Sequence, residues 1–423
     1  MEAKLPECLI PDHLPMKIRS ITCFLNPGWP LDDNLLQRCG EFVSAARPAF
    51  EGAGYEVQTS RLATVPFPSL LAELEVESLV RLAVTLERAA KQLGLGYVSL
   101  GPASPANLAS YAAIPPVLAA TEMVFLAGLM TTPAGEISLS AVRACAEVIH
   151  QAGTISPDGF ANLRFAALAN VPGGEPFFPA AYCSAEKPAF ALALEPADLA
   201  VQAAASSASL AGMRSTLIVS IESHAARLSA VADELARQTG FSFDGLDFTL
   251  APFPLEDRSI GTALERLGVP AVGLHGSLAG IAFLADTLDR ADFRRAGFNG
   301  VFFPVLEDTI LARRAAEGLL TIKDLLLFST VCGTGLDTLP LPGDISVEQI
   351  YALLLDLAAL ALRLDKPLTA RLMPIPGKQA GDPIGFDFAF FSDSRVMPVQ
   401  AEPLNRMLAG NENIKIDIRG RGK

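Results

Sequence analysis

Short apolar runs alternate with longer segments of helical periodicity along almost the whole chain. The pattern predicts a strand in MKIRSITCFL (16–25), a glycine-terminated helix in DDNLLQRCGEFVSAARPAFEGAG (32–54) and a second strand in YEVQTSRLA (55–63). The alternation continues through PAVGL (270–274) and GVFFPV (300–305) to TARLMPI (369–375), giving about ten strands separated by helices. Most strand interiors are apolar on both faces, which is typical of a sheet covered by helices.

This order of elements favours one large α/β domain over residues 17–410, with an N-terminal extension at 1–16 and a C-terminal tail at 411–423. The alternative is a pair of doubly wound domains that separate near Pro172–Tyr182, where PGGEPFFPAAYC is dense in proline and glycine. The chain has no long polar linker that would support this division.

Composition narrows the class of protein. The 423 residues are 50% hydrophobic and 19% charged, and 33 basic against 46 acidic side chains give a net charge of −13. An acidic balance argues against non-specific binding of nucleic acid and against docking on an anionic membrane. No apolar secretory core is visible, and Asp356 interrupts the apolar run YALLLDLAALALRL (351–364). The six cysteines form no CxxC pair, so we expect a reduced cytoplasmic protein with neither membrane nor nucleic-acid partners.

Familiar cofactor and hydrolase signatures are absent from the sequence. It contains no G-x-x-x-x-G-K-[ST], no G-x-G-x-x-G after a strand, no H-E-x-x-H and no G-x-S-x-G. Nucleotide cofactors therefore have no support, and candidate chemistry has to be sought in less familiar motifs.

Three polar motifs follow predicted strands. His275 in VGLHGSLAG stands at a helix start, where backbone N–H groups can hold an anion; it could act as an acid or base, or be a satisfied structural histidine. Asp257 in APFPLEDRSIG could contact a substrate, although an acid at a helix start most often caps it. Glu307 and Asp308 in FFPVLEDT could bind a divalent cation such as Mg²⁺ or Ca²⁺, or cap a helix.

A fourth motif, ARLMPIPGKQAGD (370–382), carries two basic side chains. Arg371 and Lys378 beside Asp382 could hold a carboxylate or phosphate, because an arginine fork suits such anions. A solvated turn is one alternative. Another is an internal salt bridge, since Arg371 among apolar neighbours needs a partner such as Asp337 or Asp382.

Cys332 lies in FSTVCGTGLDTLPLP (328–342), where an apolar helical run enters a glycine-rich turn and Asp337 follows. The cysteine could be a nucleophile, a metal ligand, a radical relay or a small buried apolar residue. The Gly-Thr-Gly that follows suggests backbone that passes close to a ligand or to the axis of an α/β barrel. We predict that Cys332 lies on a loop inside the barrel, close to His275 or Asp337.

These motifs together carry a resemblance. The succession APFPLEDRSIG, GLHGSLAG, VFFPVLEDT, TVCGTGLDTLPLP and ARLMPIPGKQAGD resembles the uncharacterised bacterial and archaeal family called domain of unknown function 711, over about Ile18 to Val399. Carried over residue by residue, the resemblance picks out Asp257, Ser259, His275, Gly276, Pro304, Glu307, Asp308, Cys332, Gly335, Asp337, Arg371, Pro376, Lys378, Gly381 and Asp382.

The resemblance implies mainly a fold. It is similar to the ten-stranded α/β barrel of pyruvate formate-lyase and ribonucleotide reductase, with helices outside, a cysteine loop at the centre and homodimers. A glycyl radical is not expected, because SDSRVMPVQ has Met397 and Pro398 where serine and glycine should stand. One departure is Cys183 in PFFPAAYCS, where the family commonly has histidine; cysteine can replace histidine as a soft metal ligand but not in proton transfer.

The functional expectation is an enzyme, a lyase, isomerase or hydrolase, that acts on a small anionic metabolite in an interior pocket. His275 would exchange protons, Asp337 or Glu307 would orient it or bind a divalent cation, and Cys332 would line the pocket. Substrate contacts would come from Arg371, Lys378, Asp382 and Asp257, and metal ligands from Glu307 and Asp308. The alternative is a non-catalytic protein that binds a small metabolite in the same pocket.

Overall fold

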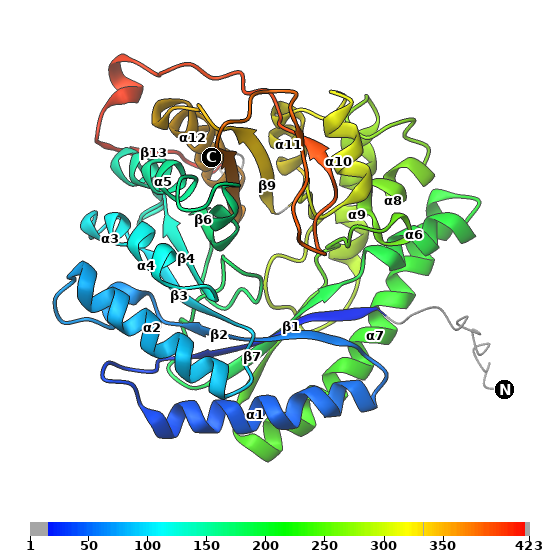
Figure 1. Ribbon diagram of the computed structural model, residues 1–423. Coiled ribbons are helices and arrows are strands. Elements are labelled where there is room, and N and C mark those ends of the chain that lie inside the picture. The colour runs from blue at the N-terminus through cyan, green and yellow to red at the C-terminus, as the bar shows by residue number, and fades with distance from the viewer. Residues whose placement is uncertain (1–15, 333, 419–423) are drawn as a thin grey trace.

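A computed structural model describes residues 16–332 and 334–418. Its centre is a nine-stranded sheet, which helices surround in Figure 1. In spatial order the strands are β8 (Ser242–Asp247), β7 (Ala189–Glu195), β1 (Lys17–Leu25), β2 (Val57–Thr64), β3 (Tyr97–Ala103), β4 (Val124–Leu129), β6 (Phe165–Ala169), β10 (Leu368–Ile375) and β9 (Gly335–Pro342). Most of the predicted N-terminal extension lies outside the described residues.

The sheet is mostly parallel. Strands β1, β2, β3, β4 and β6 run in one direction. The pair β7–β8 joins β1 antiparallel, and the pair β10–β9 joins β6 antiparallel. The strands before and after the proline-rich segment at Pro172–Tyr182 therefore belong to one sheet.

The predicted ten-stranded barrel is wrong, because the sheet has nine strands and does not close. The predicted strand GVFFPV (300–305) forms isolated bridges only, from Val301 to Leu250 and from Pro304 to Asp337. The backbone that leads into this segment is irregular, because Asn299 has a left-handed conformation (φ 47°) and its N–H donates to the Asp247 carboxylate. Backbone donors committed to a side chain are not free for a strand ladder.

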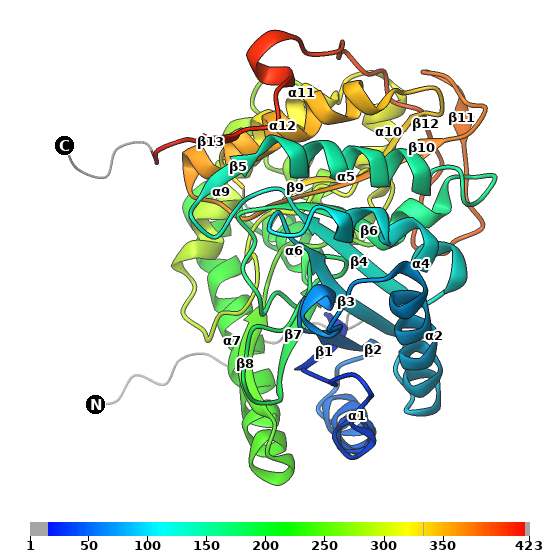
Figure 2. The ribbon, with the colours of Figure 1, turned by 90° about the vertical axis from the view of Figure 1, so that its left-hand side faces the viewer.

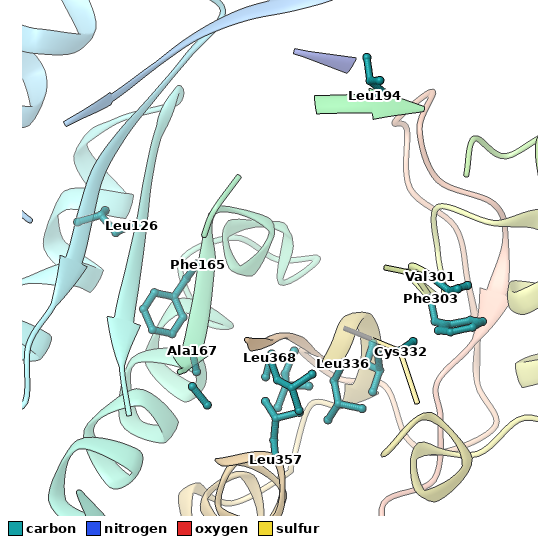
Figure 3. Packing of buried hydrophobic residues seen from close by; sticks show 14 of the residues in the cluster. Leu126, Phe165, Ala167, Leu194, Val301, Phe303, Cys332, Leu336, Leu357 and Leu368 are labelled. Carbon is teal, nitrogen blue, oxygen red and sulfur yellow. The ribbon is translucent and has the colours of Figure 1, made fainter. Parts of the chain in front are cut away.

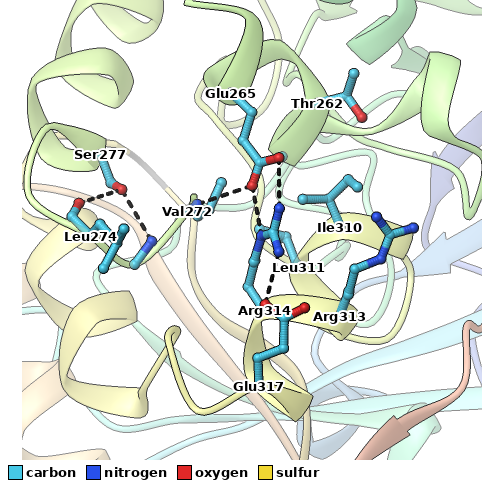
Figure 4. A network of polar contacts seen from close by, with 12 residues as sticks. Thr262, Glu265, Val272, Leu274, Ser277, Ile310, Leu311, Arg313, Arg314 and Glu317 are labelled. Atoms are coloured by element: carbon cyan, nitrogen blue, oxygen red, sulfur yellow. Dashed lines mark hydrogen bonds and ion pairs between the residues drawn. The ribbon is translucent and has the colours of Figure 1, made fainter. Parts of the chain in front are cut away.

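The predicted strand PAVGL (270–274) is a turn for a similar reason. The Val272 N–H donates to Glu265 Oε1 at 3.2 Å, and the Gly273 N–H donates to Ser277 Oγ at 3.1 Å. Figure 4 shows how Arg314 fixes Glu265 through two further hydrogen bonds. A segment whose N–H groups are taken in this way bends instead of pairing with a strand.

Twelve helices flank the sheet in the described part of the chain, many of them visible around it in Figures 1 and 2. They are α1 (Asp33–Gly52), α2 (Val76–Gln92), α3 (Ala109–Ala112), α4 (Ile114–Ala120), α5 (Leu139–Ala152), α6 (Ala197–Ser206), α7 (Leu210–Thr239), α8 (Ile260–Arg266), α9 (Ser277–Arg290), α10 (Thr309–Ala316), α11 (Ile322–Ser329) and α12 (Val347–Leu364). The short 3₁₀ helices are η1 (Phe67–Ser69), η2 (Phe160–Arg164), η3 (Glu256–Arg258) and η4 (Arg406–Ala409).

Two small strand pairs lie outside the main sheet. Strand β11 (Pro383–Ile384) pairs with β12 (Ser394–Arg395), and β5 (Glu136–Ser138) pairs with β13 (Asn413–Lys415), which lies within the predicted C-terminal tail. Among the described residues, no helix combines the length and apolar character needed to cross a membrane.

The two faces of the sheet differ in side-chain size. In β7, Phe190, Leu192 and Leu194 point into the large apolar cluster shared with the helices, part of which is drawn in Figure 3. The alternating Ala191 and Ala193 face the other side, because successive side chains of a strand point to opposite faces. These small residues leave room for the 172–183 loop, which packs there through Phe177, Phe178 and Ala181. The charged residues described next lie on this loop-covered face.

Candidate functional site

Two irregularities in the sheet mark where charged side chains gather. The pairing of β1 with β7 shifts between Ile18 and Ser20, which leaves Arg19 as an extra residue in β1. The pairing of β9 with β10 shifts so that Asp337 and Thr338 together oppose Arg371. Such bulges re-aim side chains and are frequent beside active sites.

The second bulge is conformationally strained. Thr338 has a left-handed backbone with φ 44°, which is unusual for a β-branched residue. Its hydroxyl accepts a hydrogen bond from the Leu306 N–H at 3.3 Å, and the Asp337 carbonyl accepts one from the Val305 N–H at 3.0 Å. These bonds fix the 304–308 segment, and with it Glu307, against β9. Strain of this kind is concentrated at functional sites.

A buried ion-pair network connects the two bulges. Arg371 donates to Asp337 through Nε (2.5 Å) and Nη2 (2.6 Å), and Nη2 also donates to Glu307 Oε1 at 2.6 Å. The other oxygen of Glu307 accepts a hydrogen bond from Arg19 Nη2. Arg19 Nη1 lies 3.5 Å from Oε2 of Glu195. All five side chains are at most 12% exposed, so the network is shielded from bulk water.

The network favours the charged forms of Glu307 and Arg371. Burial acts to raise the pKa of Glu307, but the guanidinium groups of Arg19 and Arg371 outweigh burial and lower it. Burial likewise acts to lower the pKa of Arg371, and the carboxylates of Asp337 and Glu307 outweigh it and raise the pKa. Both arginines of the network are therefore engaged with protein carboxylates.

Glu195, at the end of the network, differs from the other carboxylates. Burial raises its pKa to about 7, even though Arg19 and a hydrogen bond from Gln58 Nε2 at 2.7 Å favour the ionised form. Its Oε1 is buried without a hydrogen-bond partner among the described residues, and Arg258 Nη1 is 3.9 Å away. An acid with this pKa changes its charge near neutral pH.

Arg61 has a different environment from Arg19 and Arg371. It is 8% exposed, and no carboxylate of the described residues lies within 4.0 Å of its guanidinium group. Nε donates to Thr59 Oγ1 at 2.8 Å, and the guanidinium carbon lies 5.1 Å and 5.5 Å from the ring centroids of Phe178 and Tyr97. Burial and the charge of Arg19 lower its pKa to about 9. A nearly buried cation without a counter-ion is costly unless something else supplies the negative charge.

A cavity of about 60 Å³ opens beside these groups, and we call it the arginine cavity. Its polar side is formed by residues of β1, β2, β10 and the 304–308 segment, and its other walls are aromatic or apolar. The lining residues are Arg19, Gln58, Thr59, Arg61, Tyr97, Phe125, Leu163, Phe178, Glu307, Arg371, Phe388 and Phe390.

Of the residues predicted from the sequence, the structure brings Glu307, Asp337 and Arg371 together. His275 and Asp257 are exposed, in the turn before α9 and in η3. Neither they nor Lys378 and Asp382 line the arginine cavity. Asp382 instead accepts a hydrogen bond from the Gln379 N–H at 2.8 Å, which stabilises the turn that contains Lys378.

Glu307 and Asp308 point away from each other. Asp308 is fully buried and accepts hydrogen bonds from Ser259 Oγ and from the N–H groups of Ile260 and Ile310, so that it caps α10 and tethers the start of α8. Both carboxylate oxygens of Asp308 accept hydrogen bonds from protein donors. Both oxygens of Glu307 accept hydrogen bonds from arginines. In the described part of the chain, no three His, Cys, Asp or Glu side chains are grouped as metal ligands would be.

The two cysteines of interest lie in apolar surroundings. Cys332 is 1% exposed and belongs to the large apolar cluster with Leu336, where burial raises the pKa of its thiol (Figure 3). Its role in chemistry stays a prediction. Cys183 packs with Phe178 and Ala191 on the loop-covered face, and its thiol donates to the Ala185 carbonyl at 3.5 Å. Cys183 thus lies on the same face of the sheet as the arginine cavity.

Sequence reasoning missed Arg19, Arg61 and Glu195, although a signal was present. Each is a charged residue within or at the end of a segment with a strand-like pattern: the predicted strands MKIRSITCFL and YEVQTSRLA, and FALALE at 190–195. The cost of burying an unpaired charge, which drew attention to Arg371, applies equally to these three residues.

Comparison with known proteins identifies the family. The model of the family described as "Uncharacterised ACR (DUF711)" matches residues 12–392. The chain belongs to this family. Similar members include a UPF0210 protein of Pyrobaculum arsenaticum, 32% identical over 81% of this chain and 79% of its own length. A UPF0210 protein of Acetivibrio thermocellus is 29% identical over 79% and 77%, and one of Neisseria meningitidis is 26% identical over 85% and 83%. The names of these relatives state no activity.

The raised pKa of Glu195 predicts a pH dependence of stability. The folded state holds the Glu195 proton more tightly than the unfolded state, in which the pKa of the group is near 4.5. Protonation of Glu195 therefore contributes its full stabilisation below pH 4.5, and this stabilisation is lost as the pH rises to about 7. At ~1.4 kcal/mol per pKa unit the upper limit is about 3 kcal/mol. In urea unfolding, the free energy of unfolding of Glu195→Gln should therefore rise relative to that of the wild type between pH 5 and pH 8. A difference between the two proteins that does not change with pH would contradict this assignment.

Proposed function

We propose that the protein binds a small anionic metabolite in the arginine cavity. The observation that carries this proposal is Arg61: a cation only 8% exposed that lines a cavity and has no carboxylate of the described residues within 4.0 Å. Arg19 and Arg371 cannot take this role in the same way, because Glu307, Asp337 and Glu195 already engage them. An anion in the cavity would supply the missing charge and hydrogen-bond acceptors for the Arg61 fork.

The surroundings of Arg61 also suit a ligand. Thr59 holds Nε, so that the guanidinium plane is fixed and the Nη atoms are available to an acceptor. Tyr97 and Phe178 pack against the guanidinium and cover part of its surface. A pre-positioned cation in a largely apolar cavity is the usual design of a small-molecule site, with a few polar groups for orientation and apolar walls for affinity.

Catalysis by the same site is the second candidate, a lyase, isomerase or hydrolase as the sequence predicts. Glu195 favours it, since a pKa of about 7 suits proton exchange at neutral pH. Glu195 is connected to the cavity through Gln58, which lines the cavity and donates to the Glu195 carboxylate at 2.7 Å. His275, the acid–base candidate from the sequence, is exposed and outside the cavity lining.

The binding function can be tested with a thermal-shift screen of small carboxylates and phosphates on the wild type and on Arg61→Met. We expect at least one anion to raise the melting temperature of the wild type and to leave Arg61→Met unchanged, because binding stabilises only a protein that has the site. Arg290→Met is the matched control, since Arg290 forms an exposed pair with Asp286 on α9. Equal stabilisation of wild type and Arg61→Met would reject the arginine cavity as the anion site.

A further inference from the structure

We propose that the ligand of the arginine cavity is a monocarboxylate that carries an aromatic ring, and that the segment 385–393 closes over it as a flap. The inference rests on the proposed binding function and specifies its ligand. Three observations carry it: the charge balance of the cavity, the chemistry of its walls and its small volume with the flap in place.

The charge balance indicates one negative charge on the ligand. Arg19 and Arg371 are matched by Glu307 and Asp337, which leaves Arg61 as the one cation lining the cavity without a carboxylate partner among the described residues. A carboxylate would neutralise it. A phosphate dianion would instead add an uncompensated negative charge close to Glu307, which is unfavourable in a buried site.

The walls indicate an aromatic body. Tyr97 and Phe125 meet edge to face with ring centroids 5.1 Å apart, and Phe125 and Phe178 do so at 5.5 Å. Phe388 and Phe390 complete the cavity from the flap. Aromatic rings prefer offset-stacked and edge-to-face neighbours, so this arrangement of rings offers a further ring favourable contacts on several sides.

The volume indicates that the flap moves. A cavity of about 60 Å³ is far below the ~300 Å³ or more of typical ligand sites, so a ring can enter only if a wall is displaced. The flap is the wall best suited to move. Within 385–393 the structure has no helix or strand, and the rings of Phe386, Phe388 and Phe390 are only partly buried. Figure 2 shows β11 and β12, the strands that bracket the flap, at the outer edge of the molecule.

The flap is attached by hydrogen bonds near its C-terminal end and by ring contacts along its length, including Phe390 on Phe253 with ring centroids 5.7 Å apart. The Ser392 N–H donates to the Leu306 carbonyl at 2.7 Å, and Ser394 Oγ donates to the Ala312 carbonyl at 2.8 Å. Phe160 packs against Phe388 with ring centroids 5.1 Å apart and against Phe391 at 6.1 Å. Phe388 could therefore leave the cavity while the ends of the flap stay in place.

The test compares ligands that differ in one property. Benzoate and phenylacetate have both the charge and the ring, acetate lacks the ring, benzamide lacks the charge, and phenyl phosphate carries the larger charge. By calorimetry we expect benzoate or phenylacetate to bind wild-type protein at least tenfold more tightly than the other three. Amide hydrogen exchange within 385–393 should slow when the aromatic carboxylate is bound.

Variants of the flap provide the second comparison. Phe388→Ala should weaken the binding of aromatic carboxylates about tenfold or more and leave the binding of acetate unchanged, because the ring contact is lost while Arg61 is retained. Phe386→Ala is the matched control, since Phe386 packs on Phe160 and Phe391 without lining the cavity. Phe390→Leu, which keeps an apolar wall, serves if Phe388→Ala fails to fold.

The outcomes separate the two proposals. If acetate binds as tightly as benzoate and Arg61→Met abolishes both, the anion site stands and the aromatic ligand is rejected. Tighter binding of phenyl phosphate than of benzoate would reject the monoanion, and an equal loss in Phe388→Ala and Phe386→Ala would reject the flap. If wild type and Arg61→Met respond identically to every anion, the proposed function itself fails.

Discussion

Arg371→Met is expected to lower the free energy of unfolding by about 3–5 kcal/mol, the cost of breaking a buried ion pair from one side. The substitution removes all three hydrogen bonds that Arg371 gives to Asp337 and Glu307. Glu307 keeps Arg19, but Asp337 is 3% exposed and has no second ion-pair partner among the described residues. Its carboxylate must then stay buried and unpaired or take up a proton.

Urea unfolding at pH 5 and pH 8 measures this effect and its cause. Protonation removes the unpaired charge of Asp337, so the loss in Arg371→Met should be smaller at pH 5 than at pH 8. Arg290→Met, which breaks an exposed pair within one helix, should cost less than about 1 kcal/mol. A loss of under 1 kcal/mol in Arg371→Met at pH 8 would show that the buried network does not hold β9 and β10 together.

The alternation of elements could be predicted from the sequence because it depends on local periodicity. The strands around Ile21, Leu62 and Leu372 were found in this way. The prediction of a barrel failed at residues 295–305. There the N–H groups of Phe298 and Asn299 donate to Asp247, a residue about fifty positions earlier in the sequence. PAVGL failed in the same manner, since Glu265 and Ser277 take its donors. Apolar composition alone does not show which backbone groups a distant side chain will occupy.

The site could be predicted only in part, for a similar reason. Arg371 drew attention as a charge in an apolar strand, and the structure pairs it with Asp337, one of the two partners considered. His275 drew attention through flanking glycines, yet these belong to an exposed turn, with Gly273 and Gly276 in left-handed conformations. Which strands become neighbours across the loop-covered face is a tertiary property. The meeting of Arg19 with Glu307, 288 positions apart, could not be read from spacing.

Several features that destabilise the fold lie at or near the arginine cavity. Thr338 is held in a left-handed conformation, Glu195 has a buried oxygen without a hydrogen-bond partner among the described residues, and Arg61 has no carboxylate of the described residues within 4.0 Å. Each departs from the ordinary rules of backbone conformation or of pairing buried polar groups. Local violations of such rules in an otherwise consistent structure are expected where a protein has a function to perform, because binding then compensates for them.

Arg61→Met is accordingly expected to raise the stability of the unliganded protein. The pKa of about 9, below the usual 12.5, means that the folded state disfavours the charged guanidinium. At ~1.4 kcal/mol per pKa unit, the upper limit of this cost is several kcal/mol. The variant also loses two cation–π contacts, worth about 0.5–2 kcal/mol together, so the net gain should be about 2 kcal/mol. Methionine is apolar and flexible enough to fill the space between Tyr97 and Phe178.

Unfolding of the wild type and Arg61→Met in urea, without any added anion and after extensive dialysis, measures this gain. Arg61→Lys is the informative companion, because it keeps a charge without the planar fork and should not gain stability. The contrast with Arg371→Met is the decisive point: both variants remove a buried arginine from the same cavity, yet one should stabilise the protein and the other should destabilise it. The opposite signs follow from the partners alone, since Arg371 is matched by Asp337 and Arg61 by no carboxylate of the described residues. Destabilisation of the anion-free protein by Arg61→Met would mean that Arg61 is a structural residue whose charge the fold already compensates.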